Sequence, residues 1–113
     1  MGVSRRIQRV NQLIMEELSQ IILKELDFPQ GTLVTVTRVD TSPDLNRAGV
    51  YIGTVPSSPQ VFRILNKNIY FLQKLLDKRL KMRKIPRIEF IEEKETARAA
   101  RIEELLGKIK NQR

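Results

Sequence analysis

The chain has 113 residues, of which 41% are hydrophobic and 30% charged, and a formal net charge of +8 at pH 7. This length and composition predict a single globular domain over residues 1–113, with neither a membrane span nor a secretory signal, and a cytoplasmic location. Because the chain contains no Cys and no His, disulfides and thiolate metal sites are excluded and most zinc, general-base or nucleophile arrangements cannot be built. Enzymes that use only carboxylates, Lys or Ser would need a cleft that so small a domain rarely supplies, so we expect neither an enzyme nor a cofactor.

The first expected element is a helix over residues 5–26. Its apolar residues recur at spacings of three and four and form one stripe: Ile7, Val10, Ile14, Leu18 and Ile21. Pro29 and Gly31 follow, and this punctuation is typical of the end of a helix.

Two strands come next, over residues 32–40 and 48–54. The first is rich in β-branched residues. In the second, alternate residues share one face by the two-residue period of a strand: Ala48, Val50, Ile52 and Thr54. Tyr51 points to the other face, where it could serve as an RNA platform or simply meet solvent. The short connection through residues 42–46 predicts an antiparallel hairpin.

A long helical pattern begins after a loop, with Ser58 as the N-cap and Pro59 at the first helical position. Its apolar stripe is nearly continuous: Val61, Leu65, Ile69, Leu72, Leu76 and Leu80. Residues 66–68 are weak helix formers. We therefore expect either two helices with a bend near Asn68 or one bent helix.

A third strand and a last helix complete the pattern. The strand is expected to begin at Ile88, with Pro86 at its start or at a sheet edge, because proline cannot donate a hydrogen bond to the sheet. The helix would use four apolar positions, Ile102, Leu105, Leu106 and Ile109, and end in a short flexible tail. The order α-β-β-α-α-β-α predicts an α+β fold with helices stacked on one face of a three-stranded sheet.

Positive charge is concentrated in residues 74–87. This segment sets seven cations against one acid: Lys74, Lys78, Arg79, Lys81, Arg83, Lys84 and Arg87. On a helix, positions 74, 78 and 81 would share one face. A positive face opposite a buried stripe suits a phosphate backbone, and binding would depend strongly on salt. The alternative is a solvated helix face, although such a face normally mixes charges of both signs.

Two further features border this basic segment or repeat its charge. Arg5, Arg6 and Arg9 open the first helix, where the helix dipole mildly disfavours cations. That placement supports a functional role, and the alternative is a frayed terminus. Tyr70 could stack on an unpaired base, but we favour a half-buried ring that packs on the bend.

Motifs for other chemistry are missing from the sequence. No Gly-x-x-Gly loop lies between the central helices, and there is no phosphate loop or dinucleotide fingerprint. Adjacent acids such as Glu16 and Glu17 point in different directions on a helix, so they suggest charge balance. These scattered acids argue against a carboxylate-dependent hydrolase acting on nucleic acid.

Four segments carry a resemblance to a known family. They are residues 9–12 (Arg-Val-Asn-Gln), 39–45 (Val-Asp-Thr-Ser-Pro-Asp-Leu), 48–52 (Ala-Gly-Val-Tyr-Ile) and 80–90 (Leu-Lys-Met-Arg-Lys-Ile-Pro-Arg-Ile-Glu-Phe). The last is the most specific, since a basic helix end leads through Arg-x-x-Pro-x-x-x-Phe into a strand. Over nearly its whole length, the chain resembles the ribosome-binding factor A family of bacterial ribosome maturation factors.

The resemblance implies a type II KH-like fold with an added C-terminal helix. It also implies binding to the immature small (30S) ribosomal subunit during late maturation of its 16S rRNA, a role in growth at low temperature, and no catalysis. The cations of the two basic clusters would bind the RNA, with no membrane or small-molecule partner and no need for more than a monomer. The alternative is a general single-stranded RNA-binding protein or a translation regulator.

One element departs from the family pattern. The family typically has a small Ala-x-Gly element where its central helices meet, and alignment places that element on Asn68, Ile69 and Tyr70. Asn tolerates unusual backbone angles, so a bend at Asn68 is still expected. With Tyr70 at the Gly position, a sharp kink and a close approach of the backbone to RNA are less expected there.

Overall fold

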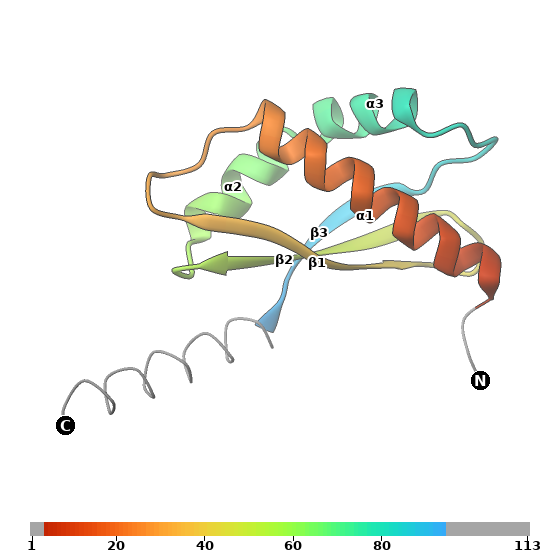
Figure 1. Ribbon diagram of the computed structural model, residues 1–113, viewed down its shortest axis with the longest axis horizontal. Coiled ribbons are helices and arrows are strands. Elements are labelled where there is room, and N and C mark those ends of the chain that lie inside the picture. Colours follow the sequence, from red (N-terminus) through yellow and green to blue (C-terminus); the bar gives the residue numbers. More distant parts are fainter. Residues whose placement is uncertain (1–3, 95–113) are drawn as a thin grey trace.

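The structure, a computed structural model, describes residues 4–94 (Figure 1). Its elements are α1 (Arg5–Glu25), β1 (Leu33–Thr41), β2 (Arg47–Val55), α2 (Pro59–Lys67), α3 (Ile69–Arg79) and β3 (Arg87–Glu92). The types and order of these six elements agree with those predicted from the sequence. The predicted last helix, with Ile102, Leu105, Leu106 and Ile109, lies outside the described residues.

Helix α1 lies across the sheet and buries one stripe. Its first turn is capped by Ser4, whose Oγ accepts a hydrogen bond from the Ile7 backbone N–H at 3.2 Å. All five residues of the predicted apolar stripe are buried, together with Ile22. Burying each such aliphatic side chain contributes about 1.5–3 kcal/mol, so this stripe holds the helix on the sheet.

The sheet has the order β1-β2-β3, with the helices on one of its faces (Figure 1). Strands β1 and β2 form the predicted antiparallel hairpin, with an irregularity in register between Val36 and Arg38. Strand β3 runs parallel to β2, from the pair Arg47–Arg87 to the pair Ile52–Glu92. A parallel neighbour requires a crossover, and α2 and α3 provide it. Pro86 precedes β3 directly, as predicted.

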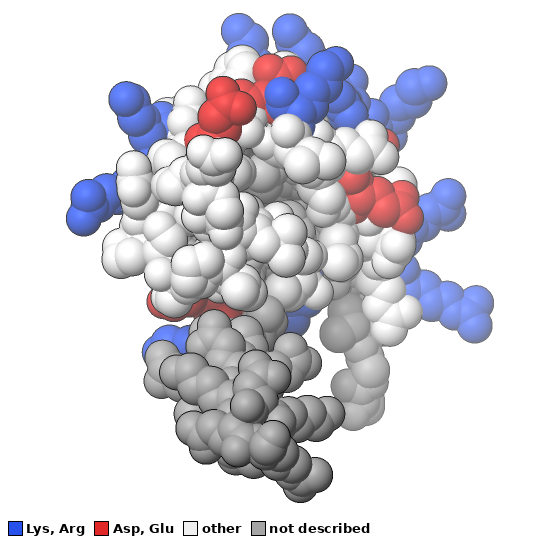
Figure 2. Space-filling model, turned by 60° about the vertical axis from the view of Figure 1, so that its left-hand side comes forward, with Lys and Arg blue, Asp and Glu red and all other residues white. Residues whose placement is uncertain are grey.

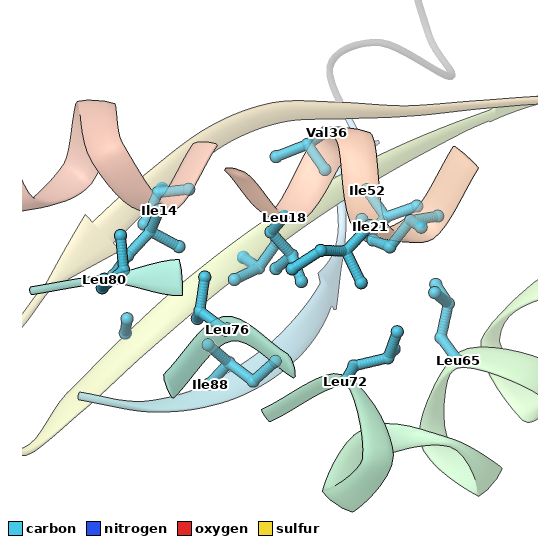
Figure 3. Close-up of a cluster of buried hydrophobic side chains, with 14 of the residues drawn as sticks. Ile14, Leu18, Ile21, Val36, Ile52, Leu65, Leu72, Leu76, Leu80 and Ile88 are labelled. Carbon is cyan, nitrogen blue, oxygen red and sulfur yellow. The ribbon is translucent and has the colours of Figure 1, made fainter. Parts of the chain in front are cut away.

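The core lies between the helices and this face of the sheet (Figure 3). Every element contributes to it, and its fully buried side chains include Ile14, Leu18, Ile21, Ile52, Leu65, Leu72, Leu76 and Ile88. The alternation in β2 is confirmed, since Ala48, Val50, Ile52 and Thr54 are all buried. Leu80, just beyond α3, also reaches the core, so the chain after this helix starts from an anchored position.

The predicted break between the central helices occurs at Asn68. This residue has φ −104° and ψ 11°, which is outside the left-handed region, and it separates α2 from α3. Its side-chain Nδ2 donates to the Ile64 carbonyl at 2.7 Å, while its backbone N–H reaches the Ile64 and Leu65 carbonyls at 3.2 Å. Asn68 therefore supplies donors to carbonyls left unpaired at a helix end. At the start of α2, Ser58 occupies the N-cap position without a side-chain capping bond.

Candidate nucleic-acid interface

Three segments that are distant in the sequence meet at one end of the molecule, on the right in Figure 1. They are the first turns of α1, the hairpin turn at residues 42–46 and the connection at residues 80–86 between α3 and β3. Together they line a groove of about 660 Å³. We call it the basic groove, because five cations line it: Arg6, Arg9, Lys81, Arg83 and Lys84.

The hairpin turn forms one wall of the basic groove and is held by Asp44. The Ser42 hydroxyl donates to Asp44 Oδ1 at 2.6 Å, and the Asn46 backbone N–H donates to the same oxygen at 3.0 Å. These hydrogen bonds favour the carboxylate and lower the pKa of Asp44 from its ordinary value, with the Ser42 hydroxyl as the largest cause. Leu45 follows with φ 62° and buries its side chain. The turn is thus a defined loop fixed by short polar side chains.

Helix α1 is held against this hairpin by Asn11. Its Oδ1 accepts a hydrogen bond from the backbone N–H of Thr41, the last residue of β1, at 2.9 Å. Arg6 and Arg9 lie within about a turn and a half of this contact along the helix. The contact therefore sets where their side chains stand relative to the hairpin turn.

The third wall, residues 80–86, is held by the side chain of Gln73 on α3. Gln73 Oε1 accepts from the Ile88 backbone N–H at 2.8 Å, and its Nε2 donates to the Pro86 carbonyl at 3.1 Å. At the other side, Lys84 Nζ donates to the Asp44 carbonyl oxygen at 3.4 Å. The chain between Leu80 and Pro86 thus connects two fixed points and carries its cations past the hairpin turn.

The charges around the basic groove are almost all positive. Asp44 is the one acid among the lining residues. The ion pairs within residues 4–94 are Arg38–Glu93, Arg47–Glu89 and Arg79–Glu17, and none involves a lining cation. Figure 2, which brings the left-hand side of Figure 1 forward, shows the contrast: the centre of that face carries no charge. The positive charge is therefore distributed unevenly over the molecule.

The predicted helical face of Lys74, Lys78 and Lys81 is wrong in one respect. Helix α3 ends at Arg79, and Leu80 has extended angles of φ −90° and ψ 125°. The helix ends there because the chain must turn back toward β3. Lys81 consequently leaves the helix and joins the basic groove, whereas Lys78 remains exposed on α3.

The other predicted RNA-binding residues fall outside the basic groove. Arg79 pairs with Glu17 of α1 at 3.2 Å, so its charge is largely committed within the protein. Arg5 is exposed beside the groove without lining it. Lys74 and Arg87 line a second hollow, of about 350 Å³, between α3 and β3. Sequence reasoning found these cations but not their division among the basic groove, the second hollow, the ion pair with Glu17 and the open surface, which depends on the tertiary structure.

Tyr70 lies at this second hollow and is 82% exposed. The prediction of a half-buried ring is therefore wrong. Ile69 is partly buried and Leu72 fully buried, and each residue of a helix advances by about 100°. Around the helix, Leu72 is therefore only about 60° from Ile69, whereas Tyr70 lies about 100° from Ile69 in the opposite direction and is turned to the solvent.

Tyr51 lies on the sheet face opposite the helices, as predicted, but it is not a bare platform. The Arg38 guanidinium carbon lies 3.8 Å from the centroid of its ring. Arg38 Nε also pairs with Glu93 at 3.2 Å. This contact is a cation–π arrangement, so the ring is covered from within the protein.

The described part of the chain holds neither a candidate metal site nor a candidate membrane-spanning helix. Residues 4–94 contain no group of three or more acidic residues placed to hold a metal ion. No helix among them is long and apolar enough to cross a membrane.

Comparisons with known proteins give one consistent result. The family profile described as ribosome-binding factor A matches residues 6–106. A ribosome-binding factor A from Nitrosococcus oceani is 36% identical over 106 residues, which cover 91% of this chain and 84% of the relative. One from Trichormus variabilis is 34% identical over 118 residues, covering the whole chain and 89% of the relative.

Solved structures agree with these sequence matches. The crystal structure of ribosome-binding factor A from Thermus thermophilus matches with a TM-score of 0.69 and 26% identity, over 76% of this chain and 93% of that one. A homology model of Thermus thermophilus ribosome binding factor A, which was fitted into a cryo-electron-microscopy map of a 30S complex, matches with a TM-score of 0.65 and 28% identity. The match covers 72% of this chain and 88% of that one. The fold is thus the type II KH-like arrangement that the resemblance implied. On the sequence and structural matches together, the chain belongs to the ribosome-binding factor A family.

Proposed function

We propose that the protein is a ribosome assembly factor that binds the immature 30S subunit and assists late maturation of 16S rRNA. It would act by RNA binding without catalysis, favouring one arrangement of the RNA over others. Its family membership supports this role, and so does a relative whose homology model was fitted into a map of a 30S complex. A protein that assists the maturation of ribosomal subunits would act in the cytoplasm. Its role would matter most for growth at low temperature, where misfolded RNA rearranges slowly.

The observation that carries the proposal is the basic groove. Five cations from two distant segments surround it, and no acid within residues 4–94 forms an ion pair with any of them. Bringing like charges together is unfavourable unless a polyanion offsets the repulsion, and RNA phosphates do so while releasing counterions. The groove therefore supports phosphate contact better than a uniform positive surface would.

We further propose how the remaining predicted residues and the whole chain take part. Lys74, Lys78 and Arg87 would add phosphate contacts beside α3, and Arg5 would extend the groove. Arg79 would contribute least, since Glu17 neutralises it. The chain would act as one domain and as a monomer, with rRNA as its partner.

The test is a pair of matched charge reversals measured on 30S precursors in rising salt. Lys81→Glu/Arg83→Glu removes two groove cations, and Lys24→Glu/Arg63→Glu makes the same charge change at exposed positions outside the groove. We expect the groove variant alone to lose most binding. Its plot of log affinity against log salt should become shallower by about 1.4 to 1.8, because two phosphate contacts are lost.

Three outcomes would contradict the proposal. One is equal loss of binding in both variants, which would indicate attraction by net charge alone. Another is binding that does not change with salt. The third is similar affinity of the unaltered protein for unrelated oligonucleotides and for 30S precursors, which would favour a general RNA-binding protein.

A further inference from the structure

Tyr70 is the most exposed aromatic side chain within residues 4–94, at 82%, and it borders the hollow that Lys74 and Arg87 line. Lys74 follows it by one helical turn on α3. Arg87 faces the same hollow from the start of β3. An open aromatic face beside cations that can reach a backbone is the arrangement by which proteins hold unpaired nucleotides.

The charges of this hollow differ from those of the basic groove. Two acids, Asp77 and Glu89, line it together with Lys74 and Arg87. Asp77 already accepts a hydrogen bond from Gln73 at 3.0 Å, and Glu89 pairs with Arg47 at 3.7 Å. Within residues 4–94, by contrast, no ion pair or hydrogen bond engages the Lys74 or Arg87 side chain. The cations are thus available to a ligand while the acids are partly occupied.

The walls of the hollow are apolar and are held in place. Ile69 and Ile88 line it from the two elements. The Gln73 side chain joins these elements through its bonds to the Ile88 N–H and the Pro86 carbonyl. The hollow, of about 350 Å³, is therefore a formed feature between α3 and β3 and does not require a rearrangement to open.

We propose that this hollow binds one unpaired nucleotide of the RNA. The base stacks on the Tyr70 ring, and the flanking phosphates meet Lys74 and Arg87. A base in a duplex is already stacked on both sides, so only an unpaired or splayed base can use the ring. The inference rests on the proposed RNA-binding function, and it adds that single-stranded character is read at a site separate from the basic groove.

The test compares two RNA probes bound by the full chain. They are an oligoadenylate and a blunt-ended RNA duplex of equal length, each carrying a fluorophore for anisotropy. Tyr70→Ala should weaken oligoadenylate binding by about 5- to 150-fold, the usual range for one stacked base, and leave duplex binding unchanged. Leu23→Ala is the matched control, since Leu23 is 85% exposed on α1, and it should change neither.

A conservative variant gives a second, direct readout. Tyr70→Trp should keep oligoadenylate affinity and, because the chain has no other tryptophan, report stacking as quenched indole emission on addition of oligoadenylate but not of duplex. The proposal is overturned if Tyr70→Ala weakens both probes equally or neither, or if the indole is not quenched at saturation. Failure of the proposed function would look different: Lys81→Glu/Arg83→Glu would then leave duplex binding intact.

Discussion

At the scale of single residues, uncharged polar side chains position the charged ones. Asn11, Asn68 and Gln73 each pair a backbone group near the end of a strand or in the last turn of a helix. A buried or half-buried backbone group without a partner is costly, so these side chains stabilise the chain where its direction changes. The basic groove depends on two of them, since Asn11 sets α1 and Gln73 sets the connection at residues 80–86.

Replacement of Gln73 tests this dependence. Gln73→Ala leaves the Ile88 N–H and the Pro86 carbonyl without their protein partner, so we expect a loss of about 1–3 kcal/mol in the free energy of unfolding. Urea denaturation measures it, with Gln60→Ala as the control because Gln60 is exposed on α2. A Gln73 variant as stable as the control would show that water replaces the side chain without cost.

At the scale of elements, the turn between β1 and β2 relies on one ionised group. The folded state lowers the pKa of Asp44 because the carboxylate accepts bonds from Ser42 and Asn46. A lowered pKa means that this contribution is fully present above the ordinary value of 3.8 and is lost as pH falls through the lower, folded value. The turn should therefore weaken only in acid.

A pH series on two variants measures that effect. The difference in urea midpoint between the unaltered protein and Asp44→Ala should be constant at neutral pH and shrink as pH drops below 3.8. Asp27→Ala controls for the loss of one acidic charge, since Asp27 is exposed beyond the end of α1. A midpoint difference that persists unchanged in acid would mean that the Asp44 side chain acts through packing.

At the scale of the whole molecule, one core joins the helices to the sheet, and the groove sits at its end (Figures 1 and 3). Leu76 of α3 and Ile14 of α1 are fully buried in it. The ends of these two helices carry cations to the groove or next to it. The spacing between the two groups of cations is thus determined by core packing, at a distance from the charges themselves.

Truncation of a core residue should therefore lower the stability of the fold that sets this spacing. Leu76→Ala should lower the free energy of unfolding by about 2–5 kcal/mol, because it removes packing and leaves a cavity. Leu33→Ala, at a position that is 64% exposed, should change it by less than about 0.5 kcal/mol. Circular dichroism during thermal unfolding measures the stability of both variants. Equal effects would contradict the assignment of Leu76 to the core.

The six described helices and strands of this protein could be predicted from the sequence alone, because helix and strand periods are local properties. The stripe of Ile14 and Leu18, the alternation around Ile52 and the break at Asn68 all follow from residues near them in the chain, and the structure confirms each one. The family could also be recognised from short motifs, since those motifs are contiguous. The two clusters of cations could likewise be identified from their positions in the sequence.

The grouping of those cations, by contrast, depends on how distant segments pack together. Arg9 and Lys81 line one groove although they are far apart in the chain, whereas Arg79 forms an ion pair with Glu17 of another helix. These outcomes come from long-range packing of α1, α3 and the hairpin, and no periodicity within a single segment contains that information.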